Sequence, residues 1–562
     1  MGARELPGIT EQAHETQTVI KFANSLRALT DSNDRRQWPL LLGCSLVTGT
    51  SRSLFLALIN TVIAAGQDHL NLLYVSALFL LVAVTLGTEY FSSITSRKVS
   101  DLLAIRLRST LLERIGSTNL RFVEREEPAR LHYHLMHTVD VVSDAYFVIL
   151  GLVTSMITLV LHFFYIGWLS WIGLLSALMI SLVGVQVHLY FERRNAKHRQ
   201  RMDMLYNTNN EHHLAYLYGF KELRLSQRKE ADYRRQIQSI NNERLGESIA
   251  EARYSSMGNM ASDFFQYLTI AGIALLLPIL AGVDSITALQ LLAAVLFTIT
   301  PLTGVVGSFS KIGRSKVSAD NLMRLLDAAA ATKESPSSPS GPPLADFKSL
   351  ALRGVAFHFE GQGESKEAGF GIGPIDLSLT PGEVIFVIGG NGSGKTVLMR
   401  LLAGLYPPDQ GQILFNGKLI ENIDRQAYRE NFACVFNDFF LFKELLGFRS
   451  TPAETIRELL HHYDLSTKTD FQERDGCFTT VALSTGQRKR LALLVARIEE
   501  RPIFILDEFG AEQDPEHREK FYRTWLPELR AMGKTVIVVS HDDRYFDAAD
   551  RVIQMDFGKI RT

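Results

Sequence analysis

Cysteine is scarce in this chain. Cys44, Cys434 and Cys477 lie far apart, and no pair has the close spacing of a zinc site or a redox-active dithiol. Their number is also odd, so a framework of disulfide bonds is not expected. The fold must therefore be held together by other means.

The chain also has no excess of charge, and its N-terminal segment is not expected to be a signal peptide. Its 59 basic and 60 acidic residues give a net charge of −1, so no global field attracts nucleic acid, and no nucleic-acid partner is expected. The N-terminal segment MGARELPGITEQAHETQ is polar and does not have the basic-then-apolar order of a cleaved signal peptide. Leu6 does not fit the myristoylation pattern either.

Long apolar stretches, in contrast, fill the first part of the chain. At 562 residues the protein exceeds the roughly 250 to 300 residues that one hydrophobic core supports, so at least two domains are expected. Buried helices of a soluble protein are the alternative, but uninterrupted runs such as LLYVSALFLLVAVTLG have no polar face. Six stretches approach the roughly 20 residues that cross a membrane: 39–65, 70–94, 143–166, 168–191, 257–282 and 286–310.

The loops between these stretches predict their topology. Loops one, three and five are short, whereas the second and fourth are long and contain basic runs such as RKVSDLLAIRLRSTLLERIG and FERRNAKHRQRM. Basic flanks mark the cytoplasmic side of a membrane protein. Both long segments keep helical spacing of apolar residues, so the membrane helices are expected to continue into the cytoplasm before they turn back.

Composition changes again after the sixth stretch. The sequence ATKESPSSPSGPP breaks all periodicity, as a linker does, and short apolar runs then alternate with helical segments, as in a parallel α/β sheet. We therefore expect four parts: a cytoplasmic N-terminal segment, a six-helix transmembrane domain, a linker and an α/β P-loop domain. Their expected bounds are 1–38, 39–330, 331–346 and 347–562.

The P-loop pattern GGNGSGKT spans residues 389–396, between the apolar run VIFVI and the helical KTVLMRLL. Glycines let successive backbone N–H groups face phosphate oxygens, and the helix N-terminus adds its positive end. Lys395 is expected on the β- and γ-phosphates of ATP, and the Thr396 hydroxyl on Mg²⁺. The expected nucleotide-binding residues of this segment are Gly389, Asn391, Gly392, Ser393, Gly394, Lys395, Thr396 and Val397.

Two acids follow a later apolar strand, PIFILDEF. Asp507 at the carboxyl end of that strand is expected to hold the metal, and Glu508 to polarise the attacking water. An apolar strand followed by two acids is common in proteins. This pair indicates a nucleotide-binding site only because a P-loop precedes it in the chain.

The segment LSTGQRKRLALLVAR resembles the signature of ATP-binding-cassette (ABC) proteins, and six spans followed by such a cassette resemble an ABC half-exporter. In that family the signature of one subunit closes over the ATP on the other subunit's P-loop. The resemblance therefore implies a homodimer, with the signature residues Ser484, Thr485, Gly486 and Gln487 next to the partner's ATP. Thr485 stands where the family most often has glycine.

The resemblance assigns four further residues. Phe359 matches the aromatic that stacks on adenine, although a core aromatic is the plain alternative. Asp514 matches the acid of the loop after the acidic pair, and His541 matches the histidine that contacts the γ-phosphate and joins Lys395 and Glu508 as a catalytic residue. Asn437 stands where the family usually has the glutamine that links Mg²⁺ to the transmembrane domain, so its shorter side chain is a departure from the pattern.

The spellings VFNDFFLF and GFKELRLSQRK look most like the cyclic-peptide branch of these exporters, which includes pyoverdine-precursor, syringomycin and microcin exporters. The resemblance implies ATP-driven export of a cyclic peptide, siderophore precursor or lipopeptide across the bacterial cytoplasmic (inner) membrane by alternating access. It also places coupling segments at residues 118–127 and 217–226.

Polar residues inside the spans are candidates to line the transport cavity, because an ionisable group facing lipid is costly. A flippase for a lipid or a lipid-linked glycan would use the same ATP-driven mechanism. An ATP-gated channel would open and close with ATP but would not pump its substrate. The candidate cavity residues are Arg52, Glu89, His162, His188, Asp263 and Gln266.

Overall fold

A computed structural model describes residues 37–65, 72–334, 346–359, 370–420 and 425–561. The expected N-terminal segment therefore lies almost wholly outside the described residues, and of the expected linker only 331–334 and 346 are described. The chain divides into two compact units, the first within 1–112 and 129–326 and the second within 113–128 and 327–562.

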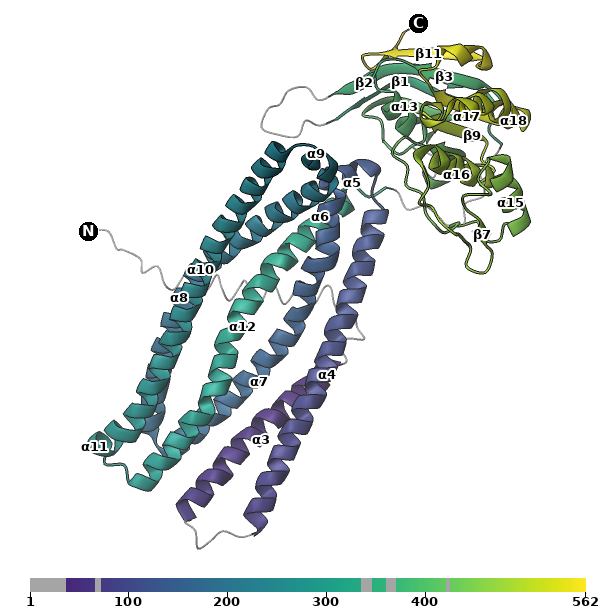
Figure 1. Ribbon diagram of the computed structural model, residues 1–562. Helices are drawn as coiled ribbons and strands as arrows, with labels where there is room; N and C mark the ends of the chain where they lie inside the picture. The colour runs from purple at the N-terminus through teal and green to yellow at the C-terminus, as the bar shows by residue number, and fades with distance from the viewer. Residues whose placement is uncertain (1–36, 66–71, 335–345, 360–369, 421–424, 562) are drawn as a thin grey trace. The chain divides into compact units, whose positions relative to one another are not determined.

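The first unit is built from long helices (Figure 1). Among the described residues, six helical segments are able to cross a membrane by length and composition, which confirms the predicted number. The long helices are α3 (Gln37–Ala65), α4 (Leu72–Gly116), α7 (Val139–Leu169), α8 (Trp171–Tyr218), α10 (Gln227–Ala271) and α12 (Ser285–Ala331). Shorter helical elements between them are α6 (Pro128–Tyr133), η2 (His134–Thr138), α9 (Phe220–Arg224), η3 (Gly272–Leu276) and α11 (Leu277–Ala281).

These helices present apolar side chains outward, as membrane helices do. The apolar stretch of α4 contains no buried residue, and Leu72 and Phe79 are 81% and 73% exposed. Small residues set the close contacts inside the unit. A β-carbon at Gly184 of α8 would lie 2.9 Å from the Phe265 side chain of α10, so a larger residue at position 184 would push these two helices apart.

The described residues of the second unit form two main sheets, besides a small two-stranded hairpin (Figure 1). The larger has the strand order β12-β11-β3-β10-β9-β6, parallel except for β12, and the smaller has the order β2-β1-β4-β5 and is antiparallel. The strands of the larger sheet are β3 (Val384–Ile388), β6 (Phe432–Val435), β9 (Ile503–Asp507), β10 (Thr535–Val539), β11 (Arg551–Asp556) and β12 (Lys559–Arg561). Those of the smaller sheet are β1 (Leu350–His358), β2 (Gly371–Leu379), β4 (Gln410–Phe415) and β5 (Lys418–Leu419).

The remaining elements of this unit are mostly helical. They are α5 (Leu120–Glu126), α13 (Lys395–Leu402), α14 (Arg425–Arg429), α15 (Ala453–His462), α16 (Thr485–Ile498), η5 (Gly510–Glu512), α17 (Pro515–Lys520), η6 (Phe521–Trp525), α18 (Leu526–Ala531) and η7 (Asp543–Ala548). A small hairpin pairs β7 (Phe471–Gln472) with β8 (Cys477–Phe478).

Strand register gathers the functional segments at one edge of the large sheet. The core strands are buried runs of β-branched and aromatic residues, as expected for a parallel sheet covered on both faces. Val539 at the end of β10 pairs with Val387 of β3 on one side and with Asp507 of β9 on the other. The loops that follow these three strands therefore meet at the carboxyl edge, where ligands bind in such sheets.

Helix α5 lies in the expected first coupling segment and contacts the cassette within this unit. Arg121 forms an ion pair with Asp409 at 3.3 Å, and Glu124 forms one with Arg400 at 2.9 Å. The Tyr406 hydroxyl donates to Glu124 at 2.6 Å, and burial, followed by this carboxylate, raises the pKa of Tyr406 to about 12. The phenol thus remains a donor at neutral pH. The expected second coupling segment contains helix α9 of the first unit.

Candidate functional site

The P-loop connects β3 to α13, and two of its glycines fit where no other residue would. Gly389 has φ +147°, and a β-carbon there would lie 2.2 Å from the Met555 carbonyl oxygen. Gly394 has φ +98°, and its β-carbon would lie 2.4 Å from Ile372. Both conformations favour glycine. The loop can therefore curl beneath a phosphate chain, with Asn391, Gly392 and Ser393 at its tip and Val397 in the first turn of α13.

Lys395 lies over this loop. Its Nζ donates to the carbonyl oxygens of Gly389 and Gly390, both at 2.9 Å. Burial lowers the pKa of Lys395, whereas the nearby Glu508 and Asp507 act in the opposite direction. The ammonium group is thus largely removed from water at the N-terminus of a helix, an arrangement suited to an anionic ligand.

Asp507 and Thr396 form a pair with the features of a Mg²⁺ site. The Thr396 hydroxyl donates to Asp507 Oδ2 at 3.0 Å, and the other carboxylate oxygen is buried without a hydrogen-bond partner among the described residues. Asp507 is fully buried, and burial is the main cause that raises its pKa. Because an unpartnered buried carboxylate oxygen is costly, and Mg²⁺ prefers oxygen ligands, these two residues fit that ion.

Glu508 lies at the end of β9 and faces two of the predicted residues. His541 Nε2 is 3.5 Å from Glu508 Oε1, and the Asn437 amide nitrogen is 3.4 Å from Glu508 Oε2. The backbone of Glu508 is left-handed, with φ +52°, which is uncommon for a residue other than glycine. Such conformations occur where the surrounding structure imposes them, often at functional sites.

Sequence reasoning missed Lys489 in helix α16. This lysine is fully buried, and its Nζ donates to Asn437 Oδ1 at 3.1 Å and to the Glu508 carbonyl oxygen at 2.9 Å. It lies in the basic run QRKR, which is typical of a solvated face. The signal was present in the helical spacing, because Lys489 precedes the buried Leu493 by one turn.

The signature residues begin α16. Ser484 is its N-cap and forms a capping box with Gln487, which explains why the helix starts at Thr485. Gly486 is close-packed, since a β-carbon there would lie 2.8 Å from the Glu512 carbonyl oxygen, and its own carbonyl accepts from Gln513. Within the described chain, no hydrogen bond joins these four residues to its own P-loop.

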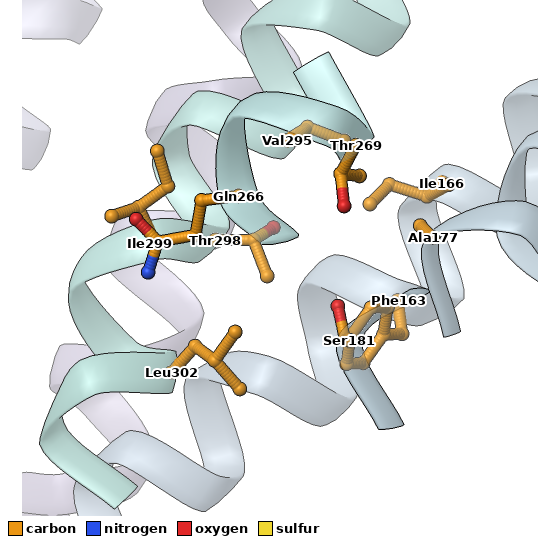
Figure 2. A pocket seen from close by; sticks show the side chains of 10 residues that line it. All are labelled: Phe163, Ile166, Ala177, Ser181, Gln266, Thr269, Val295, Thr298, Ile299 and Leu302. Carbon is orange, nitrogen blue, oxygen red and sulfur yellow. The ribbon is translucent and has the colours of Figure 1, made fainter. Parts of the chain in front are cut away.

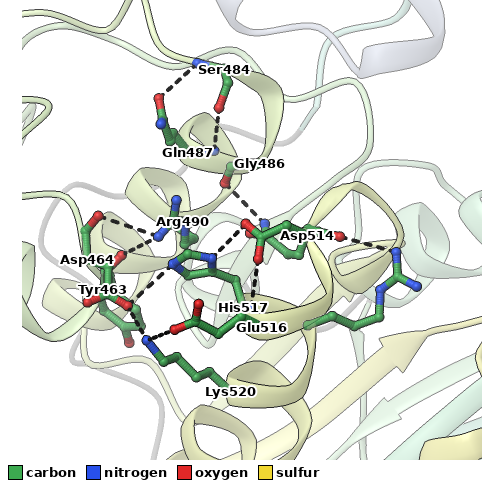
Figure 3. A network of polar contacts seen from close by, with 12 residues as sticks. Tyr463, Asp464, Ser484, Gly486, Gln487, Arg490, Asp514, Glu516, His517 and Lys520 are labelled. Carbon is green, nitrogen blue, oxygen red and sulfur yellow. Dashed lines mark hydrogen bonds and ion pairs between the residues drawn. The ribbon is translucent and has the colours of Figure 1, made fainter.

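Asp514 is part of a polar network around α16 and α17 (Figure 3). It caps α17 by accepting from the backbone N–H of His517, and the His517 ring lies 2.7 Å from its other oxygen. These contacts lower the pKa of Asp514. The opposite ring nitrogen is 3.4 Å from Asp464, whose backbone carbonyl, like that of Tyr463, accepts from the buried Arg490. The loop that carries Asp514 is thereby tied to the signature helix.

Two aromatic residues are candidates for the adenine contact. The ring of Phe359 is half-buried, edge-on to Phe357 at 5.1 Å and to Tyr406 at 6.0 Å between ring centroids. Phe370 is 45% exposed, and its ring comes within 3.6 Å of the position that a β-carbon on Gly394 would take. Sequence reasoning named only Phe359.

In the membrane unit, several candidate cavity residues are paired with neighbouring helices. Arg52 and Glu89 form an ion pair at 2.8 Å between α3 and α4, and His188 lies 3.0 Å from the Gly258 carbonyl and the Ser262 hydroxyl of α10. The ring nitrogens of His162 are buried without a hydrogen-bond partner among the described residues, and Asp263 is exposed.

Gln266 lines a pocket between α7, α8, α10 and α12 (Figure 2). Three hydroxyl residues share this lining, namely Ser181, Thr269 and Thr298, and the other six lining residues are apolar. The threonine hydroxyls donate to carbonyls of their own helices, at 2.8 Å each, and leave lone pairs free to accept. The Gln266 amide makes no hydrogen bond to another described residue. The pocket thus offers an amide and hydroxyl oxygens but no charge.

The structure therefore brings Lys395, Thr396, Asp507, Glu508, His541 and Asn437 to one edge of the large sheet. It places the signature residues at the start of α16, where the Gly486 carbonyl accepts from Gln513, the residue before Asp514.

Known protein families match two stretches of the chain. The family described as "ABC transporter" matches residues 372–511, and the "ABC transporter transmembrane region" matches residues 40–304. The chain is 29% identical to the ATP-binding protein SyrD of Pseudomonas syringae pv. syringae over 84% of both chains. It is 24% identical to the ATP-dependent lipid A-core flippase of Paraburkholderia xenovorans, covering 88% of this chain and 84% of the flippase.

A solved structure, that of a bacterial Atm1-family ABC exporter with ATP bound, has a similar fold. Its TM-score is 0.77 at 16% sequence identity, and the alignment covers 95% of each chain. At that identity the similarity supports the fold alone.

Proposed function

Because this chain is an ABC exporter, a multi-pass membrane protein with a cytoplasmic ATP-hydrolysing domain that works by alternating access, we propose that it exports a peptide-like substrate. The substrate class would be a cyclic peptide, a siderophore precursor or a lipopeptide. The similarity to SyrD, within the resemblance to cyclic-peptide exporters, is consistent with this class.

The observation that carries the proposal is the chemistry of the pocket between α7, α8, α10 and α12, whose volume of about 20 Å³ accommodates one small polar group of a substrate and not a whole peptide. None of the ten described residues that line it is charged, whereas Gln266 offers both a donor and an acceptor. Peptide amides need such partners when they leave water. The phosphates of an anionic lipid headgroup need cationic partners instead. Arg52, a cation within the spans, already forms an ion pair with Glu89.

Flipping of a lipid or lipid-linked glycan is the second candidate. It is favoured by the similarity to lipid A-core flippases of several bacteria, at 23 to 26% identity. The experiment is to measure ATP hydrolysis and transport in proteoliposomes with cyclic peptides, lipopeptides or lipid A-type lipids. Stimulation by peptides alone supports the proposal, stimulation by lipids alone replaces it with the flippase, and flux without hydrolysis indicates a channel.

For the ATP site we propose the following roles. Lys395 and the P-loop amides bind the phosphates, Phe359 stacks on adenine, and His541 contacts the γ-phosphate. Glu508 accepts the proton of the attacking water. Thr396, Asp507 and Asn437 would hold Mg²⁺, which supplies positive charge to the β- and γ-phosphates when it is bound.

The separation of the signature from the P-loop within one chain supports a homodimer with two shared ATP sites. Ser484, Thr485, Gly486, Gln487 and Asp514 would then complete the site of the second copy. ATP would bind more tightly to the closed cassette dimer than to the open one, so that ATP binding favours one conformation of the membrane domain. Hydrolysis would then let the dimer return to the other conformation.

Replacing Gln266 by leucine tests the membrane pocket. The peptide concentration for half-maximal stimulation of ATPase activity should rise by roughly 5-fold or more in this variant. The reason is that an amide of the peptide loses the Gln266 side chain as its hydrogen-bond partner in apolar surroundings. Gln186→Leu is a matched control, since Gln186 lies exposed on α8 outside the pocket. Equal shifts in both variants would remove Gln266 from the proposed site.

Replacing Phe359 by alanine should raise the KM for ATP by roughly 5- to 150-fold at a retained kcat, because stacking on a base contributes about 1 to 3 kcal/mol. Phe370→Ala is the comparison, since its ring lies beside the P-loop. A larger KM effect in Phe370→Ala, with loss of thermal stability alone in Phe359→Ala, would identify Phe359 as a core residue.

A further inference from the structure

Lys489 is a buried charge with a complete set of partners. Its ammonium group has three N–H donors and faces three acceptors: Asn437 Oδ1 at 3.1 Å, the Glu508 carbonyl at 2.9 Å and Glu512 Oε2 at 3.4 Å. A buried ammonium is tolerated only when it is satisfied in this way. Since the side chain is fully buried, a solvated role is excluded.

These partners belong to segments with different tasks. Asn437 follows β6, Glu508 directly follows β9, and Glu512 lies in η5. Lys489 itself is in the signature helix α16. One side chain therefore joins the amide that would sense the metal to the backbone of the proposed catalytic base. It lies close enough to Asp507 for its charge to favour the ionised carboxylate.

The amide oxygen of Asn437 is the atom that matters most. A carboxamide binds a metal through its oxygen, and here that oxygen accepts from Lys489 while the amide nitrogen faces Glu508. A monovalent ammonium group and a divalent metal ion on one oxygen repel each other, and they do so more strongly in a buried site than in water. The ammonium group and a metal ion are thus alternatives for this oxygen.

We propose that Lys489 is a positioning residue that holds the Asn437 carboxamide and competes with Mg²⁺ for its oxygen. Metal binding by Asn437 then requires release of Lys489, and this release links metal occupancy to the signature helix of the same cassette. The inference rests on the proposed Mg²⁺ site.

The test uses the full-length protein with Mg²⁺ as the probe. Its unfolding temperature is followed against Mg²⁺ concentration at a saturating, non-hydrolysable ATP analogue, which reports metal binding without turnover. Lys489→Met should lower the Mg²⁺ midpoint by about 5-fold, because the amide oxygen of Asn437 is freed for the metal. Lys489→Gln is measured alongside it in case the methionine variant folds poorly.

Asn437→Ala alone should change the midpoint by less than about twofold, since the oxygen is already engaged and water can replace it. In the double variant the gain from Lys489→Met should disappear, a non-additive result that shows action through Asn437. Arg488→Met is the matched control. It removes the same charge from α16, but Arg488 stacks on Phe439 instead of contacting Asn437.

Each result has one meaning. No Mg²⁺ midpoint in the wild-type protein would overturn the proposed metal site itself. A normal wild-type midpoint that Lys489→Met and Lys489→Gln leave unchanged would overturn the role of Lys489 alone. A gain that persists without Asn437, or that Arg488→Met reproduces, would show general electrostatics and would also overturn it.

Discussion

Replacing Glu508 by glutamine should slow ATP hydrolysis by about 10²- to 10⁴-fold while ATP still binds. The amide has the same shape as the carboxylate but cannot accept the proton of the attacking water. Lys395, Thr396 and Asp507 lie around the site and are untouched by the change. Because ATP stays uncleaved, a dimer closed around two nucleotides should accumulate, which is measurable by gel filtration or cross-linking.

Glu516→Gln provides the control for this experiment, because Glu516 is an exposed residue of α17 that pairs with Lys520. Its turnover should equal that of the wild type. Near-normal turnover in Glu508→Gln would move the base to another residue, and His541 at 3.5 Å would be the first to examine.

The Asp507→Asn variant should show two large effects of opposite sign. Turnover should fall by roughly 10²-fold or more, because the variant loses a proposed ligand of Mg²⁺. A bound metal ion stabilises the negative charge of the transition state by several kcal/mol. The nucleotide-free protein should become more stable, because the substitution removes a fully buried carboxylate that has an oxygen without a partner. Each kcal/mol gained would raise the unfolding temperature by roughly 2 to 4 °C.

Unfolding is followed by differential scanning fluorimetry without nucleotide and with Mg²⁺ and ATP. The stabilisation by Mg²⁺ and ATP together should be lost in Asp507→Asn. The exposed Asp543, in η7, gives the control variant Asp543→Asn, for which neither quantity should change. A lower unfolding temperature of nucleotide-free Asp507→Asn would show that the carboxylate stabilises the empty cassette.

Much of the ATP site could be predicted from the sequence because its residues follow strands. The P-loop after VIFVI, Asp507 after IFIL and His541 after VIVV all lie at strand ends, and parallel strands bring their carboxyl ends together. The six membrane helices were predictable for a similar reason, since length and apolar composition alone decide whether a helix can span a bilayer.

Side-chain partners were beyond the reach of sequence reasoning. The role of Lys489 depends on its contact with Asn437, 52 positions earlier in the chain. Helical spacing indicates that Lys489 is buried, but it does not indicate which residue Lys489 contacts. The pairing of the candidate cavity residues was likewise not predicted. Arg52 and His188 are polar residues within spans, and each bonds to a neighbouring helix, while their place in the transport cavity stays a prediction. Only three-dimensional packing separates such structural pairs from Gln266.

The left-handed backbone conformation of Glu508 lowers the stability of the folded cassette, although the proposed ATP hydrolysis needs this residue. For a residue with a β-carbon this conformation costs roughly 1 to 2 kcal/mol, whereas glycine or asparagine adopts it more readily. The proposed chemistry requires a glutamate at this position, although its backbone conformation favours glycine or asparagine. Directed evolution of this cassette for heat resistance alone would therefore tend to replace Glu508, and it would yield robust proteins that bind ATP but no longer consume it.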